Sequence, residues 1–326
     1  MNTKQIKITG ITLVFASIVI LAGIIAFNGI EADEGNIPPG VENVTRMPIK
    51  GIYERTSQPA EVASSIAFPM VPEKMVIYKV NRDISENEVK KIAASLDINS
   101  EISRGSRTIS MGEKGYAVYA IPSSAVIEYS NLTPEPGYFP DYIDTHLPSD
   151  VDARKIADEF LDQHDLRPQG AVFYSTNHDI GHFVSGDNQV EVKNSESINV
   201  WYKHWVGDYM ILTDKLHVVV DVHGEVRTMF REWPAYEPHK EFAIIGPEEA
   251  FGYLKEAGVF IPSGMKTPEK ATVTNISLVY IDQTMTDDLD YLIPVYYFQG
   301  EVQGDGTSAT FYQCIPATPE FAAEIT

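Results

Sequence analysis

The stretch DKLHVVVDVHGEVRTMF, from Asp214 to Phe230, carries the clearest signal for the fold of this chain. Its valine-rich first half favours a β-strand, because branched side chains pack well on a pleated sheet. Gly224 follows as the turn residue, since glycine readily adopts the positive φ that tight hairpins require. A second strand-like run then extends from Glu225 to Trp233. The stretch therefore predicts an antiparallel hairpin, and the unit around it can be traced outward in both directions.

The residues before this hairpin predict a helix and two further strands. Ser149 and Asp152 form a helix-capping pattern, in which the serine hydroxyl accepts a backbone N–H in the first turn. The strands are expected at Ala171–Ser175 and Ser197–Val206. Apolar residues recur at helical spacing after the cap and form one stripe, which consists of Ala153, Ile156, Ala157, Phe160 and Leu161.

The same order of elements occurs once before this unit and once after it. In the earlier unit Ser85 and Glu88 form a capping box ahead of a helix. In the later unit Pro247 suits the first helical position and Gly258 suits the end of the helix. Strand-like runs accompany both helices, at Met75–Val80, Tyr116–Ile121, Ala125–Tyr129, Val273–Ile281, Asp290–Phe298 and Ala309–Ile315.

We therefore expect an α+β fold, in which each of three tandem units consists of one helix packed on an antiparallel meander sheet. The units are placed at residues 71–133, 134–240 and 241–326. Residues 31–70 contain five prolines and show no sustained hydrophobic period, which predicts an extended stalk ahead of the units.

The hairpin around Asp221 and Gly224 carries a family resemblance. A Val-rich strand, an Asp, a turn with a Gly and a second strand resemble the PepSY-type domain and the related propeptides of thermolysin-like proteases. The strand pair Val200–Leu212 also resembles these propeptides, although Gly207-Asp208 replaces their usual Asn-Gly turn. The order of elements is similar to that of membrane-anchored extracytoplasmic regulators with tandem domains of this type, including some that restrain an essential cell-wall sensor kinase. The resemblance implies PepSY/cystatin-like units and a regulatory role through binding.

A charge-free apolar stretch runs from Ile8 to Ile30. About 23 residues make about 35 Å of helix, enough to cross the hydrocarbon core of a membrane. Lys4 and Lys7 precede this transmembrane helix and Glu31 follows it, so residues 1–7 are expected in the cytoplasm and the chain after residue 30 outside. The expectation is a single-pass protein of the cell membrane, and the alternative is a cleaved signal peptide. Glycosylation sequons occur on the outer side at Asn43, Asn131 and Asn275.

The composition limits the partners and the cofactors. The chain has 326 residues, 44% of them hydrophobic, so it can form a folded core. Its net charge of -21 argues against nucleic acid as a partner. The single cysteine, Cys314, excludes an intramolecular disulfide and a cysteine-rich metal site, and we expect it to be a buried apolar side chain.

The sequence contains no complete catalytic constellation. His178 and His182 are four residues apart, as in a metal-binding helix, but Gly181 interrupts them and predicts a loop. Ser263 and Lys266 match the S-x-x-K pattern of serine acyltransferases, yet flanking prolines favour a loop there and the other motifs of that class are missing. We therefore expect no enzyme, no catalytic residue, no metal and no cofactor. The alternative is an envelope hydrolase with carboxylates or a histidine-bound metal at its active site.

An aromatic group is the best candidate for a binding surface. Trp201 and Trp205 share one face of a predicted strand while Tyr202 and His204 share the other, so one pair is expected in the core. Core packing is expected for most of the group. Because aromatic side chains often dominate binding energy, we predict that its outward-facing members bind an envelope protein, such as a protease or a sensor kinase. The partner would bind at this surface or at a free sheet edge. The predicted partner-binding residues are Trp201, Trp205, Tyr209 and Trp233.

Overall fold

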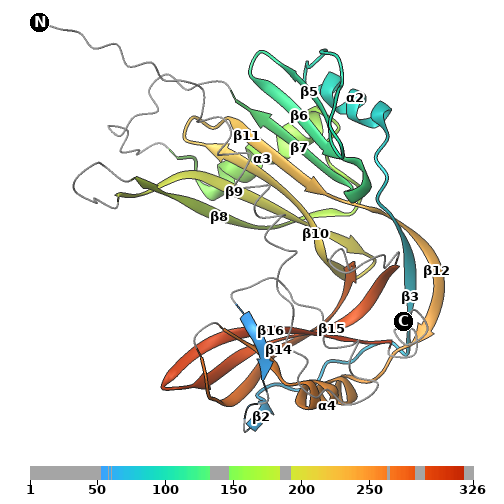
Figure 1. Ribbon diagram of the computed structural model, residues 1–326, viewed down its shortest axis with the longest axis vertical. Helices are drawn as coiled ribbons and strands as arrows, with labels where there is room; N and C mark the ends of the chain where they lie inside the picture. Colours follow the sequence, from blue (N-terminus) through green and yellow to red (C-terminus); the bar gives the residue numbers. More distant parts are fainter. Residues whose placement is uncertain are drawn as a thin grey trace, which may run out of the picture. The chain divides into compact units, whose positions relative to one another are not determined.

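The computed structural model describes residues 53–57, 59, 61–132, 147–183, 192–262, 265–282 and 291–318 (Figure 1). The apolar stretch Ile8–Ile30 and the sequon at Asn43 lie outside these residues. None of the helices in the described ranges is long and apolar enough to cross a membrane.

The described helices are α2 (Glu86–Ser95), α3 (Asp150–Gln163) and α4 (Pro247–Ala257), with a short 3-10 turn at Pro122–Ser124. The strands are β1 (Tyr53–Ser57), β2 (Glu61–Ser64), β3 (Lys74–Asn81), β4 (Ser103–Arg104), β5 (Ile109–Glu113), β6 (Tyr116–Ile121), β7 (Val126–Asn131), β8 (Ala171–Phe183), β9 (Val192–Val206), β10 (Tyr209–Asp221), β11 (Val226–Glu232), β12 (Ala235–Ala243), β13 (Val259–Pro262), β14 (Pro268–Asp282), β15 (Tyr291–Gly304) and β16 (Thr307–Pro316).

The expected α+β fold of separate helix-and-meander units is wrong. The described residues form a mostly β structure, in which 14 strands belong to one mixed sheet. The first two predicted units share that sheet because β7 pairs with β11, which places Ser130 opposite Thr228. This pairing satisfies backbone groups that a separate unit would leave exposed at its edge. Parallel pairing of β14 with β2 and with β10 makes the sheet mixed.

Strands β4 to β11, in the order β4-β5-β6-β7-β11-β10-β9-β8, form what we call the N-terminal sheet half. Helices α2 and α3 contact this half (Figure 1). The apolar stripe predicted for α3 is confirmed, because Ala157 and Leu161 are buried in one hydrophobic cluster with the strands. Helix α2 contributes Val89, Ile92 and Ala93 to the same cluster. One face of the half is therefore a core and the other carries no described helix.

Both predicted serine caps are present. The Ser149 hydroxyl accepts a hydrogen bond from the backbone N–H of Asp152 at 3.1 Å, and Ser85 accepts one from Glu88 at 3.2 Å. Such bonds satisfy donors that have no partner within the helix.

Ser149→Ala is expected to lower the free energy of unfolding by about 1 kcal/mol, because an N-cap serine contributes about that much. Urea denaturation followed by circular dichroism measures the change. The matched control is Ser106→Ala, at an exposed position outside the helices and strands. An equal loss for the two variants would contradict the role of the cap.

Helix α4 covers the second part of the sheet. Strands β14, β15 and β16 pack against it through buried residues such as Leu254, Tyr296, Phe298 and Phe311. The predicted boundaries of α4 are confirmed, since it begins at Pro247 and Gly258 ends it with a φ of 78°. We call β2, β3, β12, β14, β15 and β16 the C-terminal sheet half; the ribbon of β3 and β12 belongs to it through pairing with β15. Cys314 of β16 is fully buried, as expected.

Candidate binding surface

The alternation predicted for β9 is confirmed. Tyr202 and His204 are buried on the side of the core, whereas Trp201 is half-buried and Trp205 is 38% exposed. Since successive side chains of a strand point to opposite faces, the two tryptophans lie on the face without a described helix. This helix-free face is the best-formed candidate surface on the N-terminal sheet half.

Trp201 begins a row of rings across three strands of this face. Its ring centroid is 4.5 Å from that of His217 on β10, which stacks in turn on Phe230 of β11 at 5.5 Å. The ammonium group of Lys215 lies 5.5 Å from the centroid of Phe230. The indole N–H of Trp201 donates to the Asn177 side chain on β8. We call Trp201, His217 and Phe230 the aromatic row.

The other two predicted binding residues lie elsewhere. The Trp233 ring stacks on His204 with a centroid distance of 4.3 Å, and its N–H donates to the carbonyl of Gln169 at 3.3 Å. It packs against the α2–α3 core, so it is on the opposite side from Trp201. The Tyr209 ring meets that of Tyr280 edge-on at 6.2 Å. The structure therefore brings together only Trp201 and Trp205 of the four.

Strand β8 forms an edge of the N-terminal sheet half. It has 13 residues and pairs with β9 alone among the described strands. Val172 and Tyr174 near its start are 49% and 58% exposed. The register shifts between Phe173 and Ser175, so Tyr174 lies at a bulge. The loop predicted around Gly181 is wrong, because pairing with β9 extends the strand to Phe183.

The two candidate catalytic motifs do not assemble into a site in the described residues. The imidazole of His178 pairs with the Asp150 carboxylate at 2.9 Å, at the start of α3. No group of three metal-ligating residues occurs in the described ranges, and the side chain of His182 lies outside them. Ser263 is also outside the described residues, while the backbone N–H of Lys266 donates to Asp305 at 2.6 Å.

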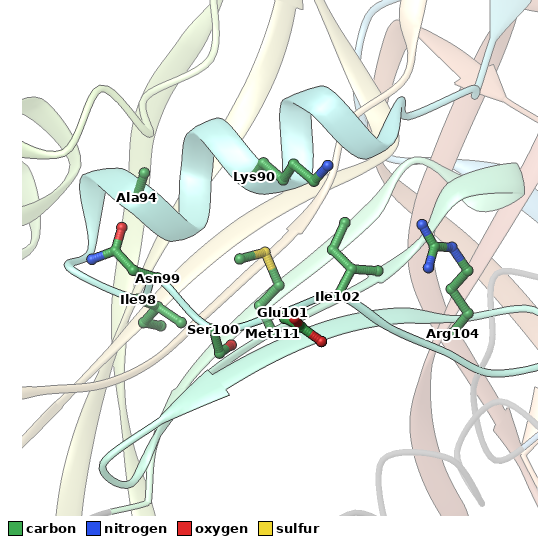
Figure 2. Close-up of a pocket in the computed structure, with 9 residues that line it drawn as sticks. All are labelled: Lys90, Ala94, Ile98, Asn99, Ser100, Glu101, Ile102, Arg104 and Met111. Carbon is green, nitrogen blue, oxygen red and sulfur yellow. The ribbon is translucent and has the colours of Figure 1, made fainter.

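A hollow of about 520 Å³ lies between α2 and the segment that leads to β4 (Figure 2). The apolar part of its wall consists of Ile98, Ile102 and Met111. Its positive charge comes from Lys90 and Arg104. The guanidinium of Arg104 is already bound by Glu86 through two hydrogen bonds of 2.7 and 2.8 Å. This hollow is therefore a weaker candidate than the helix-free face.

A buried polar group that sequence reasoning missed lies where the two sheet halves meet. We call it the joint cluster, and it consists of Arg82, His204, Asp214, Tyr236 and Asp282. Asp214 and Asp282 have side chains that are each 1% exposed. Burial raises the pKa of both carboxyls, that of Asp282 to about 7. Asp214 could have been found in the sequence, because it shares strand parity with Leu216 and Val218 and must face the core with them.

Comparison with known proteins gives structural neighbours only. No family model matches the chain, and no curated protein matches it. The crystal structure of an uncharacterized protein from Eubacterium rectale has a TM-score of 0.45 and 11% identity, and the match covers 79% of this chain and 88% of that one. The C-terminal domain of YpeB from Bacillus megaterium has a TM-score of 0.33 and 17% identity, with coverage of 73% and 95%.

Proposed function

We propose that this protein binds and regulates an envelope protein outside the cytoplasm and has no catalytic activity of its own. The resemblance of Asp214–Phe230 to PepSY-type domains supports a regulatory role. We further propose that residues 8–30 hold the chain in the cell membrane, a placement supported by the lysines before this stretch and the acidic residues after it.

The binding proposal rests on the edge of β8, with which no described strand other than β9 pairs. An edge strand offers backbone N–H and C=O groups to which an extended segment of another protein can pair. Proteins commonly protect such edges with lysine, proline, a β-bulge or a very short strand. Strand β8 contains neither lysine nor proline and is 13 residues long, and its bulge at Tyr174 lies near its start. This edge is suited to adding one strand from a partner.

The helix-free face next to β8 supports the same proposal. Val172 lies opposite Lys203 of β9, which places it on the face of Trp201 and Trp205. Val172 and Trp205 are both substantially exposed there. Alternate side chains of an added strand would pack against this apolar surface while its backbone pairs with β8. The partner is therefore expected to offer an extended segment with apolar residues at every second position, as in an exposed segment of a protease or a sensor kinase.

Photo-crosslinking from position 174 tests the binding proposal. The full chain, with a photoreactive residue in place of Tyr174, is irradiated in its native membranes, and an adduct with one envelope protein is expected. Val172→Lys and Tyr174→Lys are each expected to reduce recovery of that protein at least about tenfold, because a lysine on the edge disfavours strand addition.

Position 70 supplies the matched control. Met70 is fully exposed and apolar, and it lies outside the helices and strands. A photoreactive residue there is expected to give no adduct, and Met70→Lys is expected to leave recovery unchanged. Equal crosslinking from positions 70 and 174, or full recovery with both β8 variants, would refute binding at this edge. Detection of a hydrolytic activity that depends on His178 would favour an enzyme.

A further inference from the structure

Two buried carboxylates lie at the contact between the sheet halves. In the described strands, one residue pair, Ile211 and Tyr280, joins β10 to β14 in a parallel ladder. Asp214 follows this pair on β10 and Asp282 follows it on β14. Besides burial, the charge of Asp214 raises the pKa of Asp282. Protonation or ionisation of either aspartate therefore changes the charge next to the point where β10 pairs with β14.

Asp214 is held on both oxygens. Its Oδ2 lies 2.6 Å from Nδ1 of His204, and its Oδ1 accepts a hydrogen bond from the Tyr236 hydroxyl at 2.6 Å. His204 belongs to β9 and stacks on Trp233, while Tyr236 belongs to β12. Asp214 thus connects the N-terminal sheet half to the ribbon of β3 and β12.

Only one of the two carboxylate oxygens of Asp282 has a partner in the described part of the chain. Its Oδ1 pairs with the guanidinium of Arg82, which follows β3, and its backbone N–H donates to the Thr213 hydroxyl at 3.0 Å. The Oδ2 atom is buried and has no hydrogen-bond partner in the described part of the chain. Burial of an ionised oxygen without a partner is costly, and protonation of the carboxyl removes that cost.

Three cations lie around the pair, Arg82, Lys203 and Lys215, and in the described part of the chain one of them pairs directly with an aspartate. Lys203 donates to the backbone carbonyls of Leu212 and Asp214, and Lys215 pairs with Glu232 at 3.1 Å. Among the described residues, Arg82 is thus the cation that pairs with Asp282, whereas Asp214 contacts His204 and Tyr236. Within the described ranges, the titratable and charged groups that face the pair are Arg82, Lys203, His204, Lys215, Glu232 and Tyr236.

We propose that Asp214 and Asp282 form a pH-sensitive latch between β10 and β14, which is closed when the pair holds a proton and loosened when both carboxyls are ionised. This latch is independent of the binding proposed at β8. It would make the mobility of one sheet half relative to the other depend on the pH outside the cytoplasm.

The direction follows from proton linkage. Burial raises the pKa of Asp282 from 3.8, the value of an unperturbed aspartate, to about 7 in the folded chain. A folded-state pKa that is raised contributes stability below the unfolded pKa, and this contribution is lost as the pH rises through the folded pKa. The joint is therefore expected to be tighter at pH 5 than at pH 8, because the contribution falls as the pH rises above 3.8 and its loss is complete just above pH 7.

Hydrogen exchange of the full chain in detergent micelles tests the latch. Protection of peptides that contain Ile211 or Tyr280, corrected for the intrinsic pH dependence of exchange, is expected to fall roughly tenfold to a hundredfold between pH 5 and pH 8. Asp282→Asn is expected to abolish most of this fall, because the amide resembles the protonated acid. Arg82→Gln is expected to move the transition to higher pH, since Arg82 lowers the pKa of Asp282.

Asp165→Asn is the matched control, because Asp165 is exposed and pairs with the exposed Lys91 in a surface ion pair. It is expected to keep the profile of the unmodified chain. Protection that is constant or rises between pH 5 and pH 8 would refute the latch in the unmodified chain itself, whether or not the variants fold. An Asp282→Asn variant that folds and retains the full pH dependence would equally overturn it.

Discussion

Gly300→Ala is expected to lower the free energy of unfolding by about 3 kcal/mol. Gly300 lies on β15 between β14 and β16, opposite Val273 and Phe311. A Cβ atom at this position would be 2.3 Å from the carbonyl oxygen of Thr272 and 2.6 Å from a ring carbon of Phe311. The first of these atoms belongs to the backbone of a paired strand, so relief of the clash requires the strands to separate. Overpacking of this kind usually costs about 1–3 kcal/mol, and a fixed backbone atom places the cost at the upper end.

Gly252→Ala is the matched control, with an expected change of opposite sign. Gly252 lies inside α4, and a Cβ there meets no atom within 4 Å. Alanine in a helix interior is more favourable than glycine by about 0.5–1 kcal/mol, so this variant should be slightly more stable. Urea denaturation of the two variants side by side measures both changes. A Gly300→Ala variant as stable as the unmodified chain would show that β14 and β15 are not packed as closely as described.

The helices could be predicted because their determinants are local. Ser85 and Ser149 act on backbone groups three residues away, and the apolar stripes of α2 and α3 repeat within a few turns. Strand partners have no such local marker. The pairing of β7 with β11 joins Ser130 to Thr228 across almost 100 residues, and the capped helix α3 between them suggested a separate unit. The α+β expectation therefore failed at the level of pairing, although the elements themselves were largely located.

The part of the candidate surface that lies on a single strand, β9, could be predicted from the sequence. Alternation along β9 correctly separated Trp201 and Trp205 from Tyr202 and His204. It could not show that Trp233, on another strand, stacks on His204 from the opposite side. The joint cluster was harder still to predict. Asp214 and Asp282 are two of 46 acidic residues, and the contact of β10 with β14 brings them together.

Asp221→Ala is expected to lower the free energy of unfolding by about 3 kcal/mol. Asp221 is 5% exposed at the end of β10, in the hairpin that carries the family resemblance. Its Oδ1 accepts backbone N–H bonds from His223 and Glu225 at 2.9 and 2.8 Å, and its Oδ2 accepts one from the guanidinium of Arg227 at 2.6 Å. Removal of one member of a buried ion pair usually costs about 3–5 kcal/mol, and partial exposure of Arg227 places this case at the lower end.

Two further variants separate the ion pair from the turn. Asp221→Asn keeps an oxygen that can accept the two backbone bonds and loses only the charge, so a smaller loss is expected than for alanine. Asp208→Ala changes the exposed aspartate of the neighbouring hairpin and is expected to alter stability by less than about 0.5 kcal/mol. Chemical denaturation of all three variants measures the differences. A loss at Asp221 no larger than that at Asp208 would mean that Asp221 merely suits a turn, as aspartate does in many hairpins, and the resemblance to PepSY-type domains would then lose the residue on which it most depends.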